Sequence, residues 1–425
     1  MSGDGASPSD DGNGAWARIR RLLIRLGRSS RGERLLIALA ALVLSVGVGT
    51  VLVTVAAVAA TCGSPELVVG GFELCYDPLY VFDRLFLGAL GDPLSPGWSP
   101  LDLQMAATLR ETTILVFTGL SVAVAFQAGI FNIGTQGQLV VGALATALAV
   151  LWVSPAVGGL VGTLLLLPFG VLVGAATGGF YGAIPGALKA YADANEVITT
   201  IMLNFVATSV ALYLVQDHFK DPESLATQTR TIPEYGQFPT LVYDPRLDFS
   251  ILALLLGLAF VGGLYLLLSH TPFGYYIRTS GIQPTAAEYG GVDAARTIVG
   301  AMTLSGAMAG VGGAVYVLMV LGKFQTGVPS YGFDGITVSI LAGNNPVGVV
   351  FAALLFGVLK SGTTVVSFAT DVPPQLVGVL RGLIILFVAM PEFFRMIGRR
   401  IAPESPGPSE PRDGAESVAG GATDD

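Results

Sequence analysis

Residues His270–Arg296, HTPFGYYIRTSGIQPTAAEYGGVDAAR, form a polar interruption between two strongly apolar segments, Ile251–Leu268 and Ile298–Val320. Proline suits the first position of a helix, where its missing N–H would be unpaired in any case, and a pair of glycines ends a helix. The segment therefore predicts a short helix at Pro284–Tyr289, outside the lipid. A loop that only joins two spans does not require a helix of its own, which favours a docking surface. An ordinary connecting loop is the alternative.

The composition is that of a polytopic membrane protein. Of the 425 residues, 52% are hydrophobic and 12% are charged, whereas a soluble domain has about 25% charged residues. The 56 glycines indicate tightly packed helices, because small residues let membrane helices approach closely. The formal net charge is -8, with acidic residues concentrated at the termini and in Asp217–Asp248. This balance predicts neither nucleic acid nor an anionic lipid surface as a partner.

Apolar runs long enough to cross a bilayer recur along the chain. The first, Leu35–Ala60, follows an arginine-rich stretch that places the N-terminus in the cytoplasm. A signal peptide is the alternative, but this run is longer than the core of such a peptide. Eight further spans are predicted at Thr108–Ala128, Gln138–Val153, Val157–Gly182, Val197–Gln216, Phe249–Ser269, Thr297–Leu321, Val347–Phe368 and Leu376–Met390. A shorter segment, Gly335–Gly343, cannot cover the bilayer core and is predicted to be broken or re-entrant.

These segments predict an all-α polytopic membrane protein with about ten transmembrane helices. Counting crossings places residues 270–296 in the cytoplasm, and Arg278 and Arg296 favour the same side. The two halves begin on opposite sides, which suggests inverted repeats. The expected organisation is a disordered, then basic, cytoplasmic segment 1–34, a first helix 35–60, an external loop 61–103, helices 104–269, the cytoplasmic loop 270–296, helices 297–391 and an acidic cytoplasmic tail 392–425.

The external loop contains both cysteines, Cys62 and Cys75. A disulfide is one reading and two free thiols are the other. No metal site is expected, because the two histidines, His218 and His270, lie far from the cysteines in sequence. The amphipathic stretch Tyr80–Leu90 is predicted to lie on the membrane surface.

A polar break joins the second and third spans at Phe131–Gln138, FNIGTQGQ. Its amides can meet an uncharged polar solute, whereas a plain helix turn is the alternative. Asn204 lies deeper in a span, where a buried amide must be hydrogen-bonded, so it contacts either solute or a neighbouring helix. The residues assigned to a substrate pathway are Phe131, Asn132, Gln136, Gln138, Asn204, Asn344 and Asn345.

Charge within the spans is sparse. Only Lys360 and Arg381 are predicted there, and they either hold an anion, line an exit, snorkel or pair with backbone carbonyls. No Asp, Glu or His is expected well inside a span, although ion-driven carriers usually need such groups. The chain has no phosphate-binding GxxxxGK[ST] motif, no catalytic triad and no zinc motif. Energy for active transport must therefore come from another subunit.

Four strings carry a specific resemblance: FNIGTQGQLVVGA at Phe131–Ala143, NEVITTIMLNFVA at Asn195–Ala207, GIQPTAAEYGGV at Gly281–Val292, and GFDGITVSILAGNNPVG at Gly332–Gly348. They closely resemble the permease subunits of ABC importers for nucleosides and simple sugars, a family that includes ribose and branched-chain amino acid permeases. The second string looks most like the nucleoside branch. One departure is Gln283, which stands where many relatives have Asn.

The resemblance implies a type II-like importer fold and a coupling helix that docks on an ABC ATPase subunit. It also implies a second permease subunit, an extracellular substrate-binding lipoprotein, and ATP used by the partner with no cofactor bound here. The expected function is that of a nucleoside permease subunit in the plasma membrane, not an enzyme, with both termini cytoplasmic. A simple-sugar permease, or an ion-driven or facilitative carrier acting alone, is the alternative. The ATPase-coupling residues are Gly281, Gln283, Pro284, Ala286, Ala287, Glu288, Tyr289 and Gly290.

Overall fold

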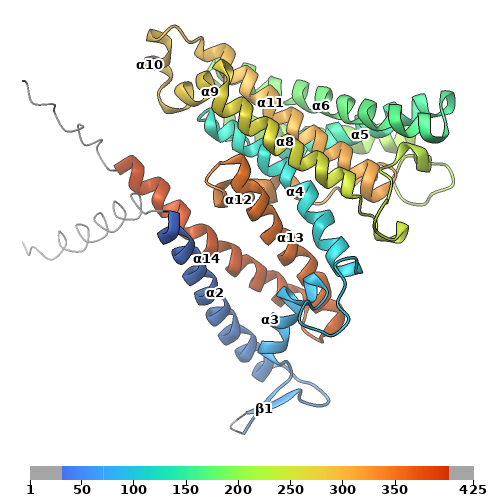
Figure 1. Cartoon of the computed structure of the whole chain (residues 1–425), viewed down its shortest axis with the longest axis vertical. Helices are drawn as coiled ribbons and strands as arrows, with labels where there is room; N and C mark the ends of the chain where they lie inside the picture. Colours follow the sequence, from blue (N-terminus) through green and yellow to red (C-terminus); the bar gives the residue numbers. More distant parts are fainter. Residues whose placement is uncertain (1–30, 70, 402–425) are drawn as a thin grey trace, which may run out of the picture. The chain divides into compact units, whose positions relative to one another are not determined.

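A computed structural model describes residues 31–69 and 71–401 (Figure 1). Ile37–Glu392 form one compact unit, and the description below concerns that unit. Residues 31–36 and 393–401 continue its first and last helices. The expectations for the N-terminal segment 1–30 and for the tail 402–425 fall outside the described residues.

Helices make up nearly all of the regular structure. The long helices are α2 (Arg31–Ala59), α4 (Leu103–Gln127), α5 (Thr135–Val153), α6 (Gly159–Ala192), α7 (Glu196–Leu214), α8 (Ile251–His270), α11 (Ala294–Val315), α13 (Pro346–Ala369) and α14 (Pro374–Ile401). The short helices are α3 (Pro78–Phe86), α9 (Pro272–Ile282), α10 (Pro284–Tyr289) and α12 (Tyr331–Leu341), and π-helical turns extend α7 over Val215–Phe219 and α11 over Tyr316–Leu321. Single 3-10 turns lie at Gly88–Leu90, Ser154–Ala156, Glu234–Gly236 and Pro245–Leu247 (η5).

The all-α membrane fold is confirmed. Among the described residues, 8 helices are long and apolar enough to cross a membrane, and α14 adds a shorter apolar stretch, Pro374–Val388. The helix α12 begins at Tyr331, four residues before the predicted segment Gly335–Gly343, and so includes Asp334. The number of crossings and the inverted repeats stay predictions.

Two segments contain more helix than the sequence indicated. The predicted span Val157–Gly182 was too short, since α6 continues to Ala192 through Pro185 and Gly186. Membrane helices tolerate such residues when neighbouring groups satisfy the backbone. In the polar interruption, α10 occupies the predicted Pro284–Tyr289, but α9 precedes it. The side chain of Thr271 caps α9 by accepting a hydrogen bond from the Gly274 N–H at 3.1 Å.

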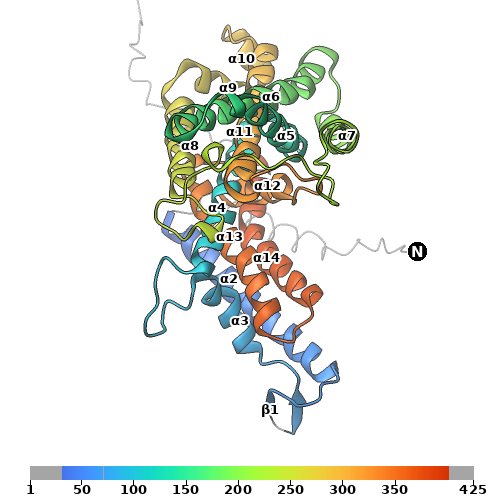
Figure 2. The same cartoon turned by 90° about the vertical axis from the view of Figure 1, so that its right-hand side faces the viewer.

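The centre of the unit is built on close backbone contact. Helix α11 packs against α4, α5 and α6, and it lies beside α5 and α6 in both views (Figures 1 and 2). Gly174 and Gly178 of α6 meet Gly306 and Gly310 of α11 so closely that a Cβ on Gly310 would collide with the Gly174 carbonyl oxygen. These glycines of α6 and α11 therefore form a helix-packing face.

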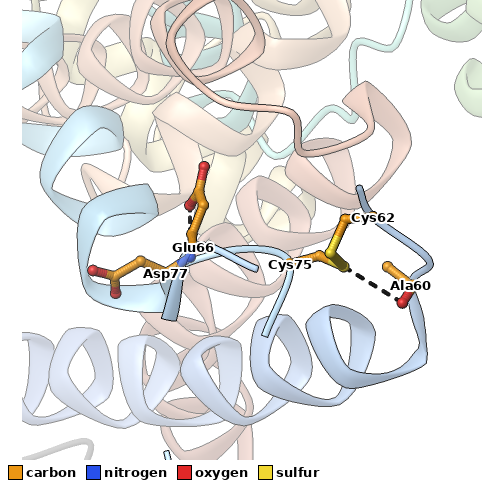
Figure 3. Close-up of a disulfide and its surroundings, with 5 residues drawn as sticks. All are labelled: Ala60, Cys62, Glu66, Cys75 and Asp77. Carbon is orange, nitrogen blue, oxygen red and sulfur yellow. Dashed lines mark hydrogen bonds between the residues drawn. A yellow bond between two sulfur atoms is a disulfide. The ribbon is translucent and has the colours of Figure 1, made fainter. Parts of the chain in front are cut away.

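The loop predicted to be external folds onto the end of α2, where the Cys75 N–H donates to the Ala57 carbonyl. Strands β1 (Leu67–Val69) and β2 (Phe72–Leu74) pair antiparallel, with Val68 opposite Glu73. A disulfide joins Cys62 to Cys75, which settles the alternatives left open by the sequence. The Asp77 N–H donates to the Glu66 carboxylate at 3.1 Å beside this disulfide (Figure 3). The loop is thus pinned by one covalent bond and by local polar contacts.

The expected membrane-surface position of Tyr80–Leu90 is wrong. Val81, Phe82 and Leu85 of α3 are buried within the protein. The backbone of Leu85 touches α13 at Gly362, where a Cβ would collide with the Leu85 carbonyl oxygen. The amphipathic stretch buries its apolar face against neighbouring helices, because a protein surface is available there.

We expect Gly310→Ala to destabilise the bundle, because overpacking a tight interface costs about 1–3 kcal/mol. Thermal unfolding of the detergent-solubilised protein measures the effect as a lower Tm. Gly262→Ala, in α8, is the matched control, since nothing lies within 4 Å of a Cβ at that position. Equal Tm values for the two variants would contradict the close-contact account.

Candidate functional site

The polar break at residues 131–138 forms a buried hydrogen-bonded network with α11. The Asn132 Nδ2 donates to Ser305 Oγ at 2.8 Å and to Gln138 Oε1 at 3.0 Å. Its Oδ1 accepts the Gly134 N–H at 2.9 Å, and Ser305 Oγ donates to the Ser121 carbonyl oxygen at 2.6 Å. Asn132 and Gln138 are both 1% exposed. Partners within the chain therefore occupy these two amides.

Two further amides tie the same break to other helices. The Asn204 Nδ2 of α7 donates to the Ile133 carbonyl at 2.9 Å, and its Oδ1 accepts the Gly137 N–H at 2.7 Å. The Gln136 Oε1 accepts the Gly332 N–H of α12 at 2.7 Å, while its Nε2 donates to the Pro329 carbonyl at 2.9 Å. The break thus links α7 to α12. A role for these amides in the solute pathway stays a prediction.

The other predicted pathway residues gather at the C-terminal end of α4. A pocket of about 470 Å³ is lined there by Gln127, Asn344 and Asn345, together with residues of α8 and α9. The Gln127 Nε2 donates to the Asn344 carbonyl at 2.8 Å. The Phe131 ring centroid is 5.0 Å from that of Phe126, a lining residue. The structure therefore separates the seven predicted residues into the amide network and this pocket.

A charged cluster joins α4, α12 and α13. The Lys360 Nζ of α13 is 3.0 Å from Asp334 Oδ2 of α12 and 3.4 Å from Glu111 Oε2 of α4. It also lies 3.9 Å from the centre of the Tyr331 ring, a cation–π distance. The Tyr331 hydroxyl donates to Glu111 Oε1 at 3.1 Å. Lys360 thus pairs with carboxylates, an arrangement that the sequence alternatives did not include.

Sequence reasoning missed this cluster because each helix contributes only one or two of its members. Glu111 lies at the edge of the predicted span Thr108–Ala128, and Asp334 was placed outside Gly335–Gly343. The available signal was the single carboxylate within the apolar string GFDGITVSIL, since an isolated charge among apolar residues needs a partner.

A second pocket, of about 780 Å³, opens beside the charged cluster. Its charged lining residues are Arg84, Arg110, Glu111, Arg246, Asp248, Lys360 and Arg381. Burial raises the pKa of the Asp248 carboxyl, and the charge of Arg110 opposes that shift. The guanidinium of Arg110 lies 3.7 Å from Glu111 Oε1 and 4.0 Å from Asp248 Oδ2. Lys360 and Arg381, both singled out from the sequence, line the same pocket.

The short helix α10 presents most of its predicted coupling residues to solvent. Gln283, Pro284, Ala286, Glu288, Tyr289 and Gly290 are exposed, whereas Ala287 is buried and Gly281 is half-buried. Tyr289 is 91% exposed and Ile282, at the end of α9, is 87% exposed. Two large apolar side chains are thus exposed beside this short helix, and its role as a docking surface stays a prediction.

Gly281 fixes this surface to the bundle. A Cβ at Gly281 would collide with the Gln127 carbonyl oxygen, and a Cβ at Gly129 would lie 2.9 Å from the Gly281 carbonyl oxygen. Gly129 also has a φ of 75°, a conformation that favours glycine. The α9–α10 junction is therefore in direct backbone contact with the C-terminal end of α4.

Comparison with known proteins gives closely related permeases. The chain is 35% identical over 323 residues to the nucleoside ABC transporter permease protein NupB of Lactococcus lactis subsp. cremoris (74% of this chain, 84% of the relative). It is 36% identical over 298 residues to the guanosine ABC transporter permease protein NupP of Bacillus subtilis (68% and 82%). It is 30% identical over 359 residues to the glucose ABC transporter permease protein TsgB13 of Haloferax volcanii (82% and 90%).

No solved structure matches the chain. The family model described as "Branched-chain amino acid transport system / permease component" matches residues 104–389. That range holds the amide network, the exposed α10 and most of the residues that line both pockets. The chain therefore belongs to the permease family of branched-chain amino acid transport systems.

Proposed function

We propose that this chain is the transmembrane permease subunit of an ATP-driven importer for nucleosides. One observation carries the proposal: two relatives named for nucleosides and guanosine are 35% and 36% identical and are covered over 84% and 82% of their length. A simple-sugar permease is the second candidate, because a relative named for glucose is 30% identical. The chain then provides the path, and a separate subunit hydrolyses ATP.

The exposed α10 is the proposed docking site for the ABC ATPase. Tyr289 and Ile282 supply apolar anchors of the kind that dominate interface energies, and Glu288 adds an exposed charge beside them. The chain has no phosphate-binding loop of its own, so the energy must enter through a contact. The cytoplasmic position of α10, inferred from its flanking arginines, fits this contact.

Movement of α10 would reach the solute path through α4. The Gly281–Gly129 backbone contact leaves no space for independent sliding of the two segments, and Gln127 hydrogen-bonds the Asn344 carbonyl between α12 and α13. A pull on α10 therefore shifts the end of α4 and the α12–α13 turn together. Interfaces this tightly packed move as units rather than deforming continuously.

A second permease is the proposed partner within the membrane. Lactococcus lactis and Bacillus subtilis each also contain a more distant relative, NupC (26% identical) and NupQ (27% identical), named for the same transport. This pairing supports a heterodimer. An extracellular binding lipoprotein would deliver the solute, and the complex would lie in the plasma membrane with both termini of this chain cytoplasmic.

An ion-driven carrier acting alone remains the contrasting class. Glu111 and Asp334 are carboxylates largely buried in the bundle, and ion-driven carriers use acidic groups of this kind, which weakens the sequence argument against a carrier. The chain is similar in sequence to an ABC transporter permease over 74% of its length, which favours the importer. Glu111 and Asp334 also share the cation of Lys360, which leaves no vacant acidic pair for a coupling ion.

Proteoliposomes test the proposed function directly. The chain, co-purified with its ATPase, second permease and binding lipoprotein, should accumulate tritiated guanosine only when ATP is supplied to the ATPase side. Excess glucose should not compete. Guanosine accumulation by the purified chain in ATP-free liposomes would reject the importer in favour of a carrier, and uptake of glucose alone would select the sugar permease.

Changes on α10 should separate ATP hydrolysis from uptake. We expect Glu288→Lys, Pro284→Ala and Tyr289→Ser each to reduce guanosine uptake by at least about tenfold, since removing a central anchor costs about 2 kcal/mol or more. Membrane insertion should be unchanged, because Glu288 and Tyr289 make no buried contact. Tyr213→Ser, at an exposed position of α7, is the control. Normal uptake by all three α10 variants would contradict the docking role.

Asn204 tests whether the amide network holds the bundle together or contacts solute. Asn204→Leu removes both its hydrogen bonds and leaves a buried Gly137 N–H and Ile133 carbonyl unpaired, at a cost of about 1–3 kcal/mol. We expect a lower Tm in detergent, with Thr208→Val as the control that loses one hydrogen bond within α7. Loss of uptake with an unchanged Tm would instead indicate contact with the solute.

A further inference from the structure

The pocket beside the charged cluster lies where several helices begin or end. It is lined by Leu103 and Gln104 at the start of α4, by Phe368 and Ala369 at the end of α13, and by Arg246–Asp248 just before α8. The ends of apolar helices mark the boundary between the membrane core and water. The proposed topology places these ends outside, so the pocket opens at the outer boundary of the bilayer.

The lining of this pocket carries more positive than negative charge. Arg84 pairs with Asp83 and Asp92, which do not line the pocket. Lys360 likewise pairs with Asp334 as well as with a lining carboxylate. The excess charge therefore belongs to the other arginines of the lining. The lining cations are Arg84, Arg110, Arg246, Lys360 and Arg381, and the lining carboxylates are Glu111 and Asp248.

These other arginines are weakly paired or unpaired. The guanidinium of Arg110 lies 3.7 Å from Glu111 Oε1 and 4.0 Å from Asp248 Oδ2, which is too far for a hydrogen bond. Within the part of the chain that the structure describes, neither Arg246 nor Arg381 forms an ion pair. Their charge is thus available to an anion from outside the chain.

The position of Arg381 makes such an anion most useful. Arg381 is half-buried and lies about 10 Å along α14 from the start of that helix at Pro374. Its neighbours Val377, Leu380 and Ile384 are buried in an apolar cluster. A charged side chain among membrane-spanning helices is costly unless it is paired or faces a cavity. Arg381 faces the pocket, where a bound anion would supply the partner.

The surroundings indicate what kind of anion fits. Guanidinium groups bind phosphate oxygens through paired, charge-assisted hydrogen bonds. On the pocket lining, Phe368 is 88% exposed and Leu103 is 58% exposed, so apolar surface lies beside the arginines. Tyr80 lies 5.2 Å from the Arg84 guanidinium, and Trp98 precedes α4. Tyrosine and tryptophan are enriched at the level of lipid headgroups. A phosphate attached to an apolar chain matches these features.

We propose that this pocket binds a phosphate-bearing anion through Arg110, Arg246 and Arg381. An acidic phospholipid of the outer leaflet and free inorganic phosphate share this chemistry, and the apolar lining favours the phospholipid. The net charge of -8 predicts no general attraction to an acidic membrane surface, whereas a local excess of arginine acts at contact distance. The inference goes beyond the proposed function and does not depend on the transported solute.

Binding to the full-length chain in a neutral detergent tests the inference. Phosphatidylglycerol is titrated onto the delipidated protein, and bound lipid is counted by native mass spectrometry. Zwitterionic phosphatidylcholine is the comparison, and it should bind more weakly. We expect Arg246→Gln and Arg381→Gln each to weaken phosphatidylglycerol binding by at least about tenfold, the factor for losing one hydrogen bond to a charged group.

Three further variants and measurements support the assignment to the pocket. Arg230→Gln is the matched control, because Arg230 is exposed in the same loop as Arg246 but does not line the pocket. It should bind phosphatidylglycerol as wild type does. Arg381→Lys keeps the charge and should retain more binding than Arg381→Gln. The Tm without lipid should not fall in Arg246→Gln, since that side chain is exposed, so weaker binding in this variant cannot come from misfolding.

Inorganic phosphate separates the two sources of the anion. If the source is free phosphate, phosphate should raise the Tm of the wild type but not of Arg381→Gln, and the two lipids should bind alike. If the source is the lipid, phosphatidylglycerol should be preferred and phosphate should leave the Tm unchanged. Equal binding of the two lipids together with no effect of phosphate would overturn the inference, as would equal loss of phosphatidylglycerol binding in Arg230→Gln. These measurements need neither ATP nor guanosine, so the proposed function stands or falls separately.

Discussion

Backbone contact between α6 and α11 is the interaction on which the rest of the bundle depends. Lipid tails provide no hydrophobic driving force between helices, so association relies on van der Waals packing and on hydrogen bonds. Gly174, Gly178, Gly306 and Gly310 remove the side chains that would separate the two axes. The same approach brings Gly142 of α5 against Gly310. Water is excluded from this centre, and every polar group near it must then find a partner in the protein.

The amide network satisfies that requirement, and the charged cluster satisfies it less completely. Asn132, Gln136 and Asn204 use both ends of their amides within the chain, which makes the polar break rigid. Glu111 keeps one carboxylate oxygen without a hydrogen bond at the wall of a pocket. The amides therefore help to build the fold, whereas the charged cluster keeps a buried oxygen that no hydrogen bond satisfies. Residue type alone would assign the amides, rather than the charges, to the solute.

The sequence was sufficient for the features that depend on local pattern. Apolar runs located the long helices, and the proline and paired glycines placed α10 at Pro284–Tyr289. Features that depend on long-range pairing were inaccessible. Glu111 and Lys360 lie on different helices far apart in the chain, as do Asn132 and Ser305, and no local pattern relates them. The predicted end of α6 was wrong for a different reason. Pro185 and Gly186 tend to end helices in soluble proteins, whereas a membrane helix tolerates them.

Helix α4 connects the region of α10 at its C-terminal end to the charged pocket near its N-terminal end. Its interior is buried from Thr112 to Ala125, so it cannot bend into free space when one end is displaced. Its C-terminal end contacts Gly281 next to α10, and its N-terminal third bears Glu111 and Arg110 at the outer pocket. A shift imposed at α10 must therefore change the distance between Glu111 and Lys360, unless α12 and α13 move with α4. Gln127 bonds to the Asn344 carbonyl, so we expect the α12–α13 turn to follow the C-terminal end of α4. Linkage requires the converse as well: whatever fixes the N-terminal part of α4 against its neighbours also biases the position of α10 at the proposed ATPase contact.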